Sequence, residues 1–142
     1  MFRYILGYFF FIPKFFPYIK KKNKIRPYFG FPKRDFGGPN VRTKKMIKIF
    51  GNYLFSPNII YAQSWWDQKE LEDAYNFSQK NNVPIVFNQN GWFYPAWYKG
   101  NWKRRNETII KIQKISEKVI YQSNFCKIAS KKLNNYVKSQ NF

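Results

Sequence analysis

The chain has 142 residues, which is enough for one domain with a hydrophobic core of its own. A single cysteine and no histidine exclude an internal disulfide framework, favour a reducing compartment and argue strongly against a zinc or iron site built from this chain's side chains. The formal charge of +19 predicts an anionic partner, although an A/T-rich coding sequence would by itself produce many of the same Lys, Asn, Ile, Phe and Tyr residues.

Residues 1–24 differ from the rest of the chain and are predicted to form an N-terminal extension. The apolar stretch from Ile5 to Ile12 is far shorter than the ~20 residues that a membrane-spanning helix requires. It also lacks the small-residue cleavage site of a secretory signal. Aromatic residues beside Lys20–Lys22 leave two interpretations open, contact with a membrane surface and a poorly ordered extension.

The first predicted strand lies within residues 24–31 and is weak, because Pro27 cannot donate a hydrogen bond to a strand ladder. A glycine turn, Phe36–Asn40, follows it. The next apolar residues have the spacing of one helix face, which predicts a helix that buries Met46, Ile49, Phe50, Tyr53 and Leu54.

A second strand is predicted at residues 58–62, and a helix begins after it. Asp67 and Glu70 have the spacing of an N-cap residue and its capping-box partner. Asn81–Asn82 are expected to end this helix. Its buried face is predicted to contain Leu71, Ala74, Tyr75 and Ser78.

The third strand, Ile85–Phe87, is an apolar run typical of a strand buried on both faces. Amides at residues 88–90, Gly91 and a group of aromatic residues at 92–98 follow directly. Open α/β sheets bind ligands at the carboxyl ends of their strands, so this segment predicts a ligand site. The alternative is an aromatic loop that only covers the sheet edge.

The remainder of the chain repeats the alternation. Asn101 or Asn106 is expected to cap a helix that buries Ile109, Ile112 and Ile115, and residues 118–122 form a fourth strand. Ser123 caps a last helix, whose inward residues are expected to be Phe125, Ile128, Ala129, Leu133 and Tyr136. This order predicts an α/β class, Rossmann-like domain at residues 25–142, with a parallel sheet and helices on both faces.

Polar or glycine-rich residues end three of the strands, and such ends meet at one edge of a parallel sheet. Amides and tryptophan rings together suit the hydroxyls and ring of a sugar. The residues predicted to bind a substrate there are Gly37, Gly38, Gln63, Ser64, Trp65, Gln89, Asn90, Gly91 and Trp92. Core packing of Trp65–Trp66 and a local turn role for Asn90 are the structural alternatives.

Three cations near the aromatic segment, Lys99, Arg104 and Arg105, are candidates for phosphate contact, with a solvated helix start as the alternative. No catalytic residue is predicted, because most of the seven acidic residues fall on the predicted helices. The dinucleotide-binding G-x-G-x-x-G and the phosphate-binding P-loop are both absent.

Four segments of the chain resemble the amino-terminal domain of group 1 (family 4-type) glycosyltransferases, which have the GT-B architecture. In chain order they are F-G-G-P-N, N-I-I-Y-A-Q-S-W-W, V-P-I-V-F-N-Q-N-G-W-F-Y-P-A-W-Y-K-G and K-V-I-Y-Q-S-N-F-C-K. In that family this domain binds mainly the acceptor, and a second domain binds mainly the nucleotide-sugar donor. The resemblance implies no metal and no cofactor.

Carried over by position, Gly37 and Gly38 match the family's glycine turn near the donor phosphates. Gln63 and Asn90 stand where many members have histidines, so a base role at these positions does not transfer. Ser123 matches the serine that opens the last helix and joins the predicted substrate-binding residues. The family's second domain, which carries a Glu-x7-Glu pattern, has no counterpart in these residues. It is expected on a separate domain or subunit.

The resulting prediction is a cytoplasmic glycosyltransferase-like domain, peripheral to the inner face of the membrane and incomplete as an enzyme by itself. It would bind a glycan or lipid-linked acceptor for transfer from a nucleotide-sugar donor. A non-enzymatic module for single-stranded nucleic acid is the alternative, but it is less favoured because the motifs of common RNA-binding folds are absent. A third hypothesis is peripheral contact of the basic surface with anionic membrane.

Overall fold

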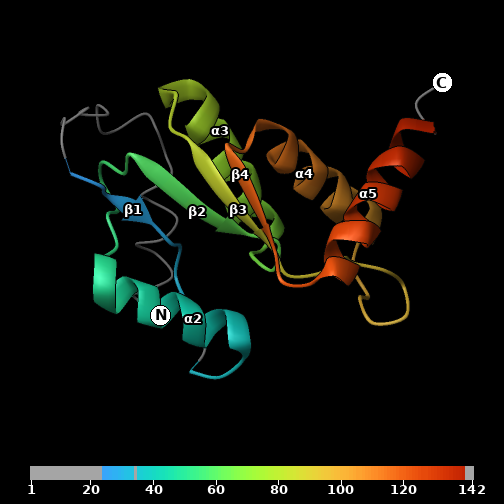
Figure 1. Ribbon diagram of the computed structural model, residues 1–142, viewed down its shortest axis with the longest axis horizontal. Helices are drawn as coiled ribbons and strands as arrows, with labels where there is room; N and C mark the ends of the chain where they lie inside the picture. The colour runs from blue at the N-terminus through green and yellow to red at the C-terminus, as the bar shows by residue number, and fades with distance from the viewer. Residues whose placement is uncertain (1–23, 34, 140–142) are drawn as a thin grey trace.

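The computed structural model describes residues 24–33 and 35–139, with side chains described up to residue 133. The predicted extension lies almost wholly outside these residues, as does the side chain of Tyr136. Four parallel strands in the order β1-β2-β3-β4 form one sheet and alternate with four described helices, which confirms the predicted α/β class (Figure 1). The elements are β1 Pro27–Tyr28, α2 Gly38–Phe50, β2 Ile59–Gln63, α3 Gln68–Asn81, β3 Ile85–Gln89, α4 Trp102–Ile115, β4 Lys118–Tyr121 and α5 Asn124–Ser139.

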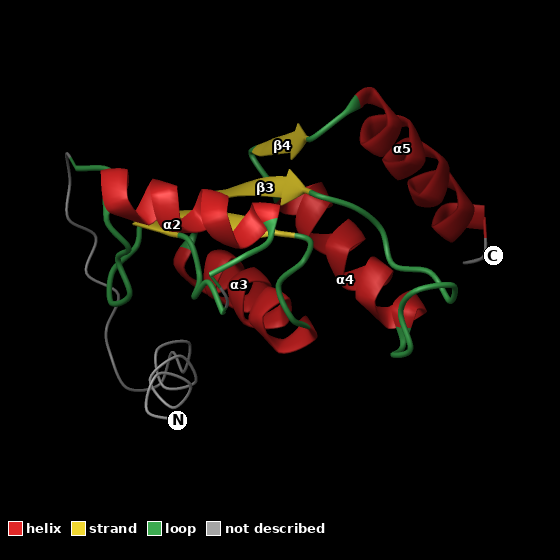
Figure 2. Ribbon diagram, turned by 90° about the horizontal axis from the view of Figure 1, so that it is seen from below, coloured by secondary structure: helices red, strands yellow, loops and turns green. Residues whose placement is uncertain are grey.

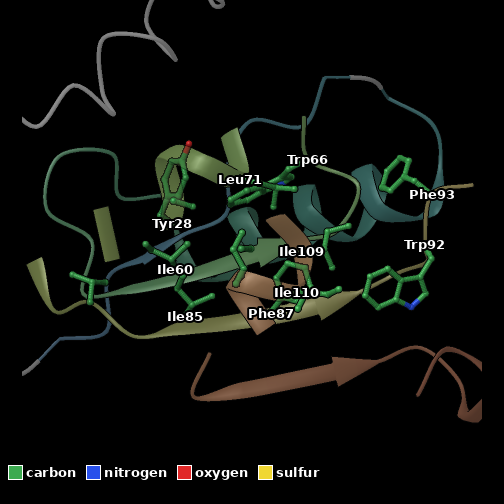
Figure 3. Close-up of a cluster of buried hydrophobic side chains, with 14 residues drawn as sticks. Tyr28, Ile60, Trp66, Leu71, Ile85, Phe87, Trp92, Phe93, Ile109 and Ile110 are labelled. Carbon is green, nitrogen blue, oxygen red and sulfur yellow. The ribbon is translucent and has the colours of Figure 1, made fainter. Parts of the chain in front are cut away.

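One hydrophobic core lies between the sheet and the helices α3 and α4, which share one side of the sheet (Figure 2). Inward residues of the strands, such as Ile60, Ile85 and Phe87, meet Leu71 of α3 and Ile109 of α4 (Figure 3). The predicted inward faces of both helices are therefore confirmed. Trp66, Trp92 and Phe93 also belong to this core, so these aromatic residues have a structural role.

Helix α2 packs on the other face of the sheet. Phe29 contacts the Tyr61 ring at 5.6 Å and Phe50, the last residue of α2, at 6.5 Å. Ile60, the neighbour of Tyr61 in β2, packs instead with Leu71 of α3, and successive strand residues point to opposite faces. Because β1, β2 and β3 are neighbours in that order, the crossovers through α2 and α3 have opposite hands, so one of them departs from the strong right-handed preference.

The outer edge of β1 is covered by the segment that leaves α2. The side chain of Asn52 accepts from Phe29 N at 3.0 Å and donates to Gly30 O at 2.9 Å. Tyr53 N donates to Pro27 O at 2.9 Å. These bonds replace those of a neighbouring strand and protect the sheet edge from pairing with another chain.

The apolar faces predicted for the first and last helices are wrong in part. Helix α2 ends at Phe50, because Gly51 adopts a φ of 77°, and Ile49 and Phe50 are exposed. In α5, Phe125 and Ile128 are exposed by 78% and 54%. The residues of α2 that face the sheet are polar, Asn40 and Thr43, a pattern that hydrophobic periodicity cannot detect.

The start of α3 has the predicted capping box. Asp67 accepts from Glu70 N at 2.8 Å, and the Glu70 carboxylate accepts from the backbone of Asp67 and of Phe31. Burial raises the pKa of Glu70 from 4.5 to about 7, with a smaller contribution from the Asp67 carboxylate. Lys33, whose Nζ lies 2.5 Å from Asp67 Oδ2, opposes this rise in the pKa of Glu70.

This raised pKa predicts a pH-dependent stability. Between pH 4.5 and about 7 the folded chain holds a proton on Glu70 that the unfolded chain has released, so stability falls as the pH rises through this window. At about 1.4 kcal/mol per pH unit, the loss reaches up to about 3 kcal/mol. Urea unfolding at about pH 5 and about pH 8 should show this drop for the wild type, and Glu70→Gln should remove most of it. An equal drop in both proteins would contradict the assignment.

Candidate functional site

Three side-chain amides meet at the carboxyl edge of the sheet, one from the end of each of three neighbouring strands. Gln63 ends β2, Asn90 follows β3 and Gln122 follows β4. Asn90 Nδ2 lies 3.5 Å from Gln63 Oε1, and the amides of Asn90 and Gln122 meet at 2.5 Å. We call Gln63, Asn90 and Gln122 the amide cluster; Gln63 and Asn90 are two of the predicted site residues, and Gln122 is an addition from the structure.

The orientation of the Gln63 amide is fixed by its neighbours. The Trp65 indole, which can only donate, bonds to Gln63 Oε1 at 2.9 Å. Gln63 Nε2 therefore points to α2, where it donates to Thr43 Oγ1 at 2.6 Å, and Thr43 in turn donates to Pro39 O at 2.9 Å. The contact between Gln63 Oε1 and the Asn90 amide, at 3.5 Å, is longer than an ordinary hydrogen bond and leaves the Asn90 amide able to turn.

Gln122 connects the cluster to α2. With its amide turned so that the oxygen faces α2, Gln122 accepts from both terminal nitrogens of Arg42, at 3.0 and 3.2 Å. The Asn90 amide, 2.5 Å from this oxygen, then donates to it, and gives up only its long contact with Gln63. Within the described part of the chain Arg42 forms no ion pair with a carboxylate.

Ser64 holds the ends of β2 and β3 together beside the amide cluster. Asn90 N donates to Ser64 Oγ at 2.9 Å, and Ser64 N donates to Asn88 O at 3.1 Å. Two buried acceptors on the α2 side of the sheet, Asn88 Oδ1 and Asn40 Oδ1, have no donor among the described residues. The region between α2 and the strand ends is thus rich in hydrogen-bonding groups that the fold itself leaves unused.

Two of the predicted site residues lie away from the amide cluster. The Gln89 amide lies inside the core, where it accepts from Gln113 of α4 at 2.9 Å and donates to Gly91 O at 2.5 Å. The Trp92 indole is buried and donates to Ser130 of α5 at 3.1 Å. Both side chains join structural elements together.

The predicted glycine and serine residues lie in the segments that carry the cluster and its neighbours. Gly37, with a φ of 89°, precedes α2, and Gly38 begins that helix, which also carries Arg42 and Thr43. A side chain would meet no atom within 4 Å at Gly38 or Gly91, so the backbone is open to approach there. Ser123 caps α5, because its Oγ accepts from Cys126 N at 3.2 Å, as predicted.

The three predicted phosphate-binding cations have different surroundings. Arg105 is only 5% exposed; it donates to the carbonyls of Trp65 and Trp66 and stacks on the Phe93 ring at 4.3 Å. Arg104 pairs with Glu72 of α3 at 2.9 Å. Lys99 is exposed in the loop before α4. None of the three takes part in the amide cluster.

The chemistry available at the cluster is hydrogen bonding and charge recognition. The three amides contact the Thr43 hydroxyl and the Arg42 guanidinium of α2, and no carboxylate takes part in these contacts. Among the described residues, no three His, Cys, Asp or Glu side chains gather where they could hold a metal ion. The arrangement therefore suits a ligand that offers both acceptors and hydroxyl groups.

Sequence reasoning did not identify Arg42, Thr43 and Gln122. Arg42 and Thr43 lie within a helix predicted from apolar spacing, and Gln122 was expected only to end a strand. The available signal was the order of the strand ends, since Gln122 follows β4 as Gln63 ends β2. No described helix is both long and apolar enough to cross a membrane. Comparison of the chain with protein-family models, curated proteins and solved structures finds no match to any of them.

Proposed function

We propose that the chain is the acceptor-side half of a GT-B-type sugar transferase, and that the amide cluster and Arg42 bind the polar head of a glycan or lipid-linked acceptor. The Rossmann-like sheet and the resemblance of its strand-end segments to group 1 glycosyltransferases support this proposal. In this proposal a second domain or subunit would bind the nucleotide-sugar donor.

The position of Arg42 beside the amide cluster is the observation that carries the proposal. Its guanidinium contacts the Gln122 amide at 3.0 and 3.2 Å and forms no ion pair with a carboxylate among the described residues, so its charge is available to an acceptor group of a ligand. Sugar hydroxyls both donate and accept, and a phosphate or diphosphate linker provides acceptors of the kind arginine recognises best. The Trp65 ring bonds to Gln63 and is partly buried against the core, so its remaining exposed surface lies next to the cluster, where it would pack on a sugar ring.

Cys126 provides a direct test because it is the chain's single cysteine and its Sγ lies 4.0 Å from Asn90 O. A ligand bound at the amide cluster should slow alkylation of this thiol, which mass spectrometry measures as a single mass shift. We would screen short-chain polyprenyl-phosphate-linked saccharides, free oligosaccharides and nucleotide sugars. Protection by an acceptor saccharide supports the proposal, and absence of protection across the whole panel contradicts it.

Arg42→Met should weaken the protecting ligand by about tenfold or more, because a hydrogen bond to a charged group is lost. Lys45→Met is the matched control, since Lys45 is exposed one turn along from Arg42 on α2 and the substitution removes the same charge. The ligand concentration that halves the alkylation rate gives the affinity of each protein. Equal weakening in both variants would show that the effect is general electrostatics and would overturn the role of Arg42.

A further inference from the structure

The loop between β3 and α4 presents an apolar tip whose role the amide cluster does not explain. Its residues Tyr94, Pro95, Ala96 and Trp97 are all exposed, with Tyr94 at 53% and Trp97 at 54%. Figure 1 shows this loop extending away from the sheet between β3 and α4. We call residues 94–97 the aromatic tip.

Hydrogen bonds and ring contacts at the base of the loop hold the aromatic tip in place. Asn106 of α4 bonds to both backbone groups of Phe93, accepting from its N at 3.1 Å and donating to its O at 2.8 Å. The backbone N–H groups of Trp97 and Tyr98 both donate to Tyr94 O, at 3.3 and 3.1 Å. The buried Phe93 ring supports Trp97 at 4.9 Å and Tyr98 at 4.8 Å.

The charge around the tip has one sign. Residues 91–105 contain Lys99, Lys103, Arg104 and Arg105 and no acidic residue. Lys99 and Lys103 are exposed, and neither pairs with a carboxylate in the described part of the chain. Lys103 lies over the Trp102 ring at 5.7 Å. A preorganised Trp–Tyr surface beside exposed lysines that lack a carboxylate partner matches the interface of an anionic bilayer, where aromatic rings sit at headgroup depth and lysines meet lipid phosphates.

From this geometry we infer that the aromatic tip is a membrane-docking element, which inserts Tyr94 and Trp97 into the headgroup region of an anionic bilayer while Lys99 and Lys103 bind the headgroups. Preorganisation favours this use, because the rings need no further ordering when they are buried. The inference is independent of the ligand of the amide cluster. It assigns the membrane contact to a particular loop. The net charge of the chain by itself does not locate such a contact.

The test is co-sedimentation of the full chain with vesicles of phosphatidylcholine, with and without phosphatidylserine. The double variant Tyr94→Ser/Trp97→Ser should lower the partition coefficient by about tenfold or more, since two half-exposed aromatic side chains lose their apolar contact. The matched control is Phe125→Ser/Ile128→Ser, which removes comparably exposed apolar side chains from α5. It should retain the wild-type partition coefficient.

Lys99→Ala and Lys103→Ala should each lower binding to phosphatidylserine vesicles by about fivefold and leave binding to pure phosphatidylcholine unchanged.

Trp97→Phe keeps an aromatic side chain at the tip and should retain binding, but it should reduce the fraction of tryptophan fluorescence quenched by brominated lipid. Buried Trp66 and Trp92 supply an internal unquenched signal.

Wild-type partitioning by the Tyr94→Ser/Trp97→Ser variant would overturn the inference, as would an equal loss in the α5 control. A loss of single-stranded oligonucleotide binding in the tip variant, with vesicle binding unchanged, would assign the loop to base stacking instead and would also overturn it.

Discussion

Gly30→Ala is expected to lower the free energy of unfolding by about 3 kcal/mol or more. Gly30 has a φ of 72°, a region that disfavours residues with a Cβ atom. A Cβ there would lie 2.7 Å from Glu70 Oε1 and 2.7 Å from Trp66 Cζ2. The Trp66 ring cannot withdraw, because it is 1% exposed and packs edge-on against Tyr28 at 5.9 Å.

Gly91→Ala is the control for Gly30→Ala. Gly91 lies outside the helices and strands, is not among the glycines with positive φ, and a Cβ there would meet no atom within 4 Å apart from its chain neighbours. Alanine restricts the unfolded chain more than glycine does, so this variant should be unchanged or more stable by up to about 1 kcal/mol. Urea unfolding followed by circular dichroism and tryptophan fluorescence measures both variants. Equal midpoints for the two proteins would contradict the tight packing assigned to Gly30.

Arg105→Met is expected to destabilise the fold by about 3 kcal/mol, with a range of roughly 2 to 4. Arg105 donates to the carbonyl oxygens of Trp65 and Trp66 and stacks on Phe93, so it ties α4 to the end of β2 and to the aromatic loop. Methionine fills much of the same space but leaves those carbonyls without their donor. Burial lowers the pKa of Arg105, which is consistent with a structural cation removed from water.

The neighbouring Arg104 provides a matched control. Its side chain is 63% exposed and forms a surface ion pair with Glu72, so Arg104→Met should cost less than about 1 kcal/mol. Urea unfolding at neutral pH compares the two methionine variants directly. If Arg105→Met lowered the free energy of unfolding as little as Arg104→Met, the structural role assigned to Arg105 would be wrong. The predicted phosphate contact of Arg105 would then be the better interpretation.

The sequence predicted the alternation of strands and helices well because local signals specify it. Asp67 and Glu70 mark the start of α3 by capping chemistry, Asn82 ends it in a left-handed conformation, and Asn101 caps α4 as one of two candidates. Buried residues on α3 and α4, such as Leu71, Ala74, Ile109 and Ile112, repeat at helical spacing because each helix packs one face on the sheet. These properties depend on residues within one or two turns of each other.

The exposed faces of α2 and α5 could not be predicted in the same way. Ile49, Phe125 and Ile128 have the spacing of buried positions, yet they are exposed, while Asn40 and Thr43 face the sheet. Hydrophobic periodicity states which residues share a face of a helix. It does not state which face meets the sheet, since that depends on where distant elements place the helix.

The candidate site divides along the same line. The sequence by itself determined that polar residues end the strands, that the sheet is parallel and that Gln63 and Asn90 therefore lie at one edge. Only the tertiary structure decided that Arg42 and Gln122 join them, that Gln89 and Trp92 serve the core and that Arg105 is structural. The succession of strands and helices along the chain is a property of local sequence pattern, whereas a hydrogen bond between α2 and the end of β4 requires residues far apart in the chain to reach the same point in space.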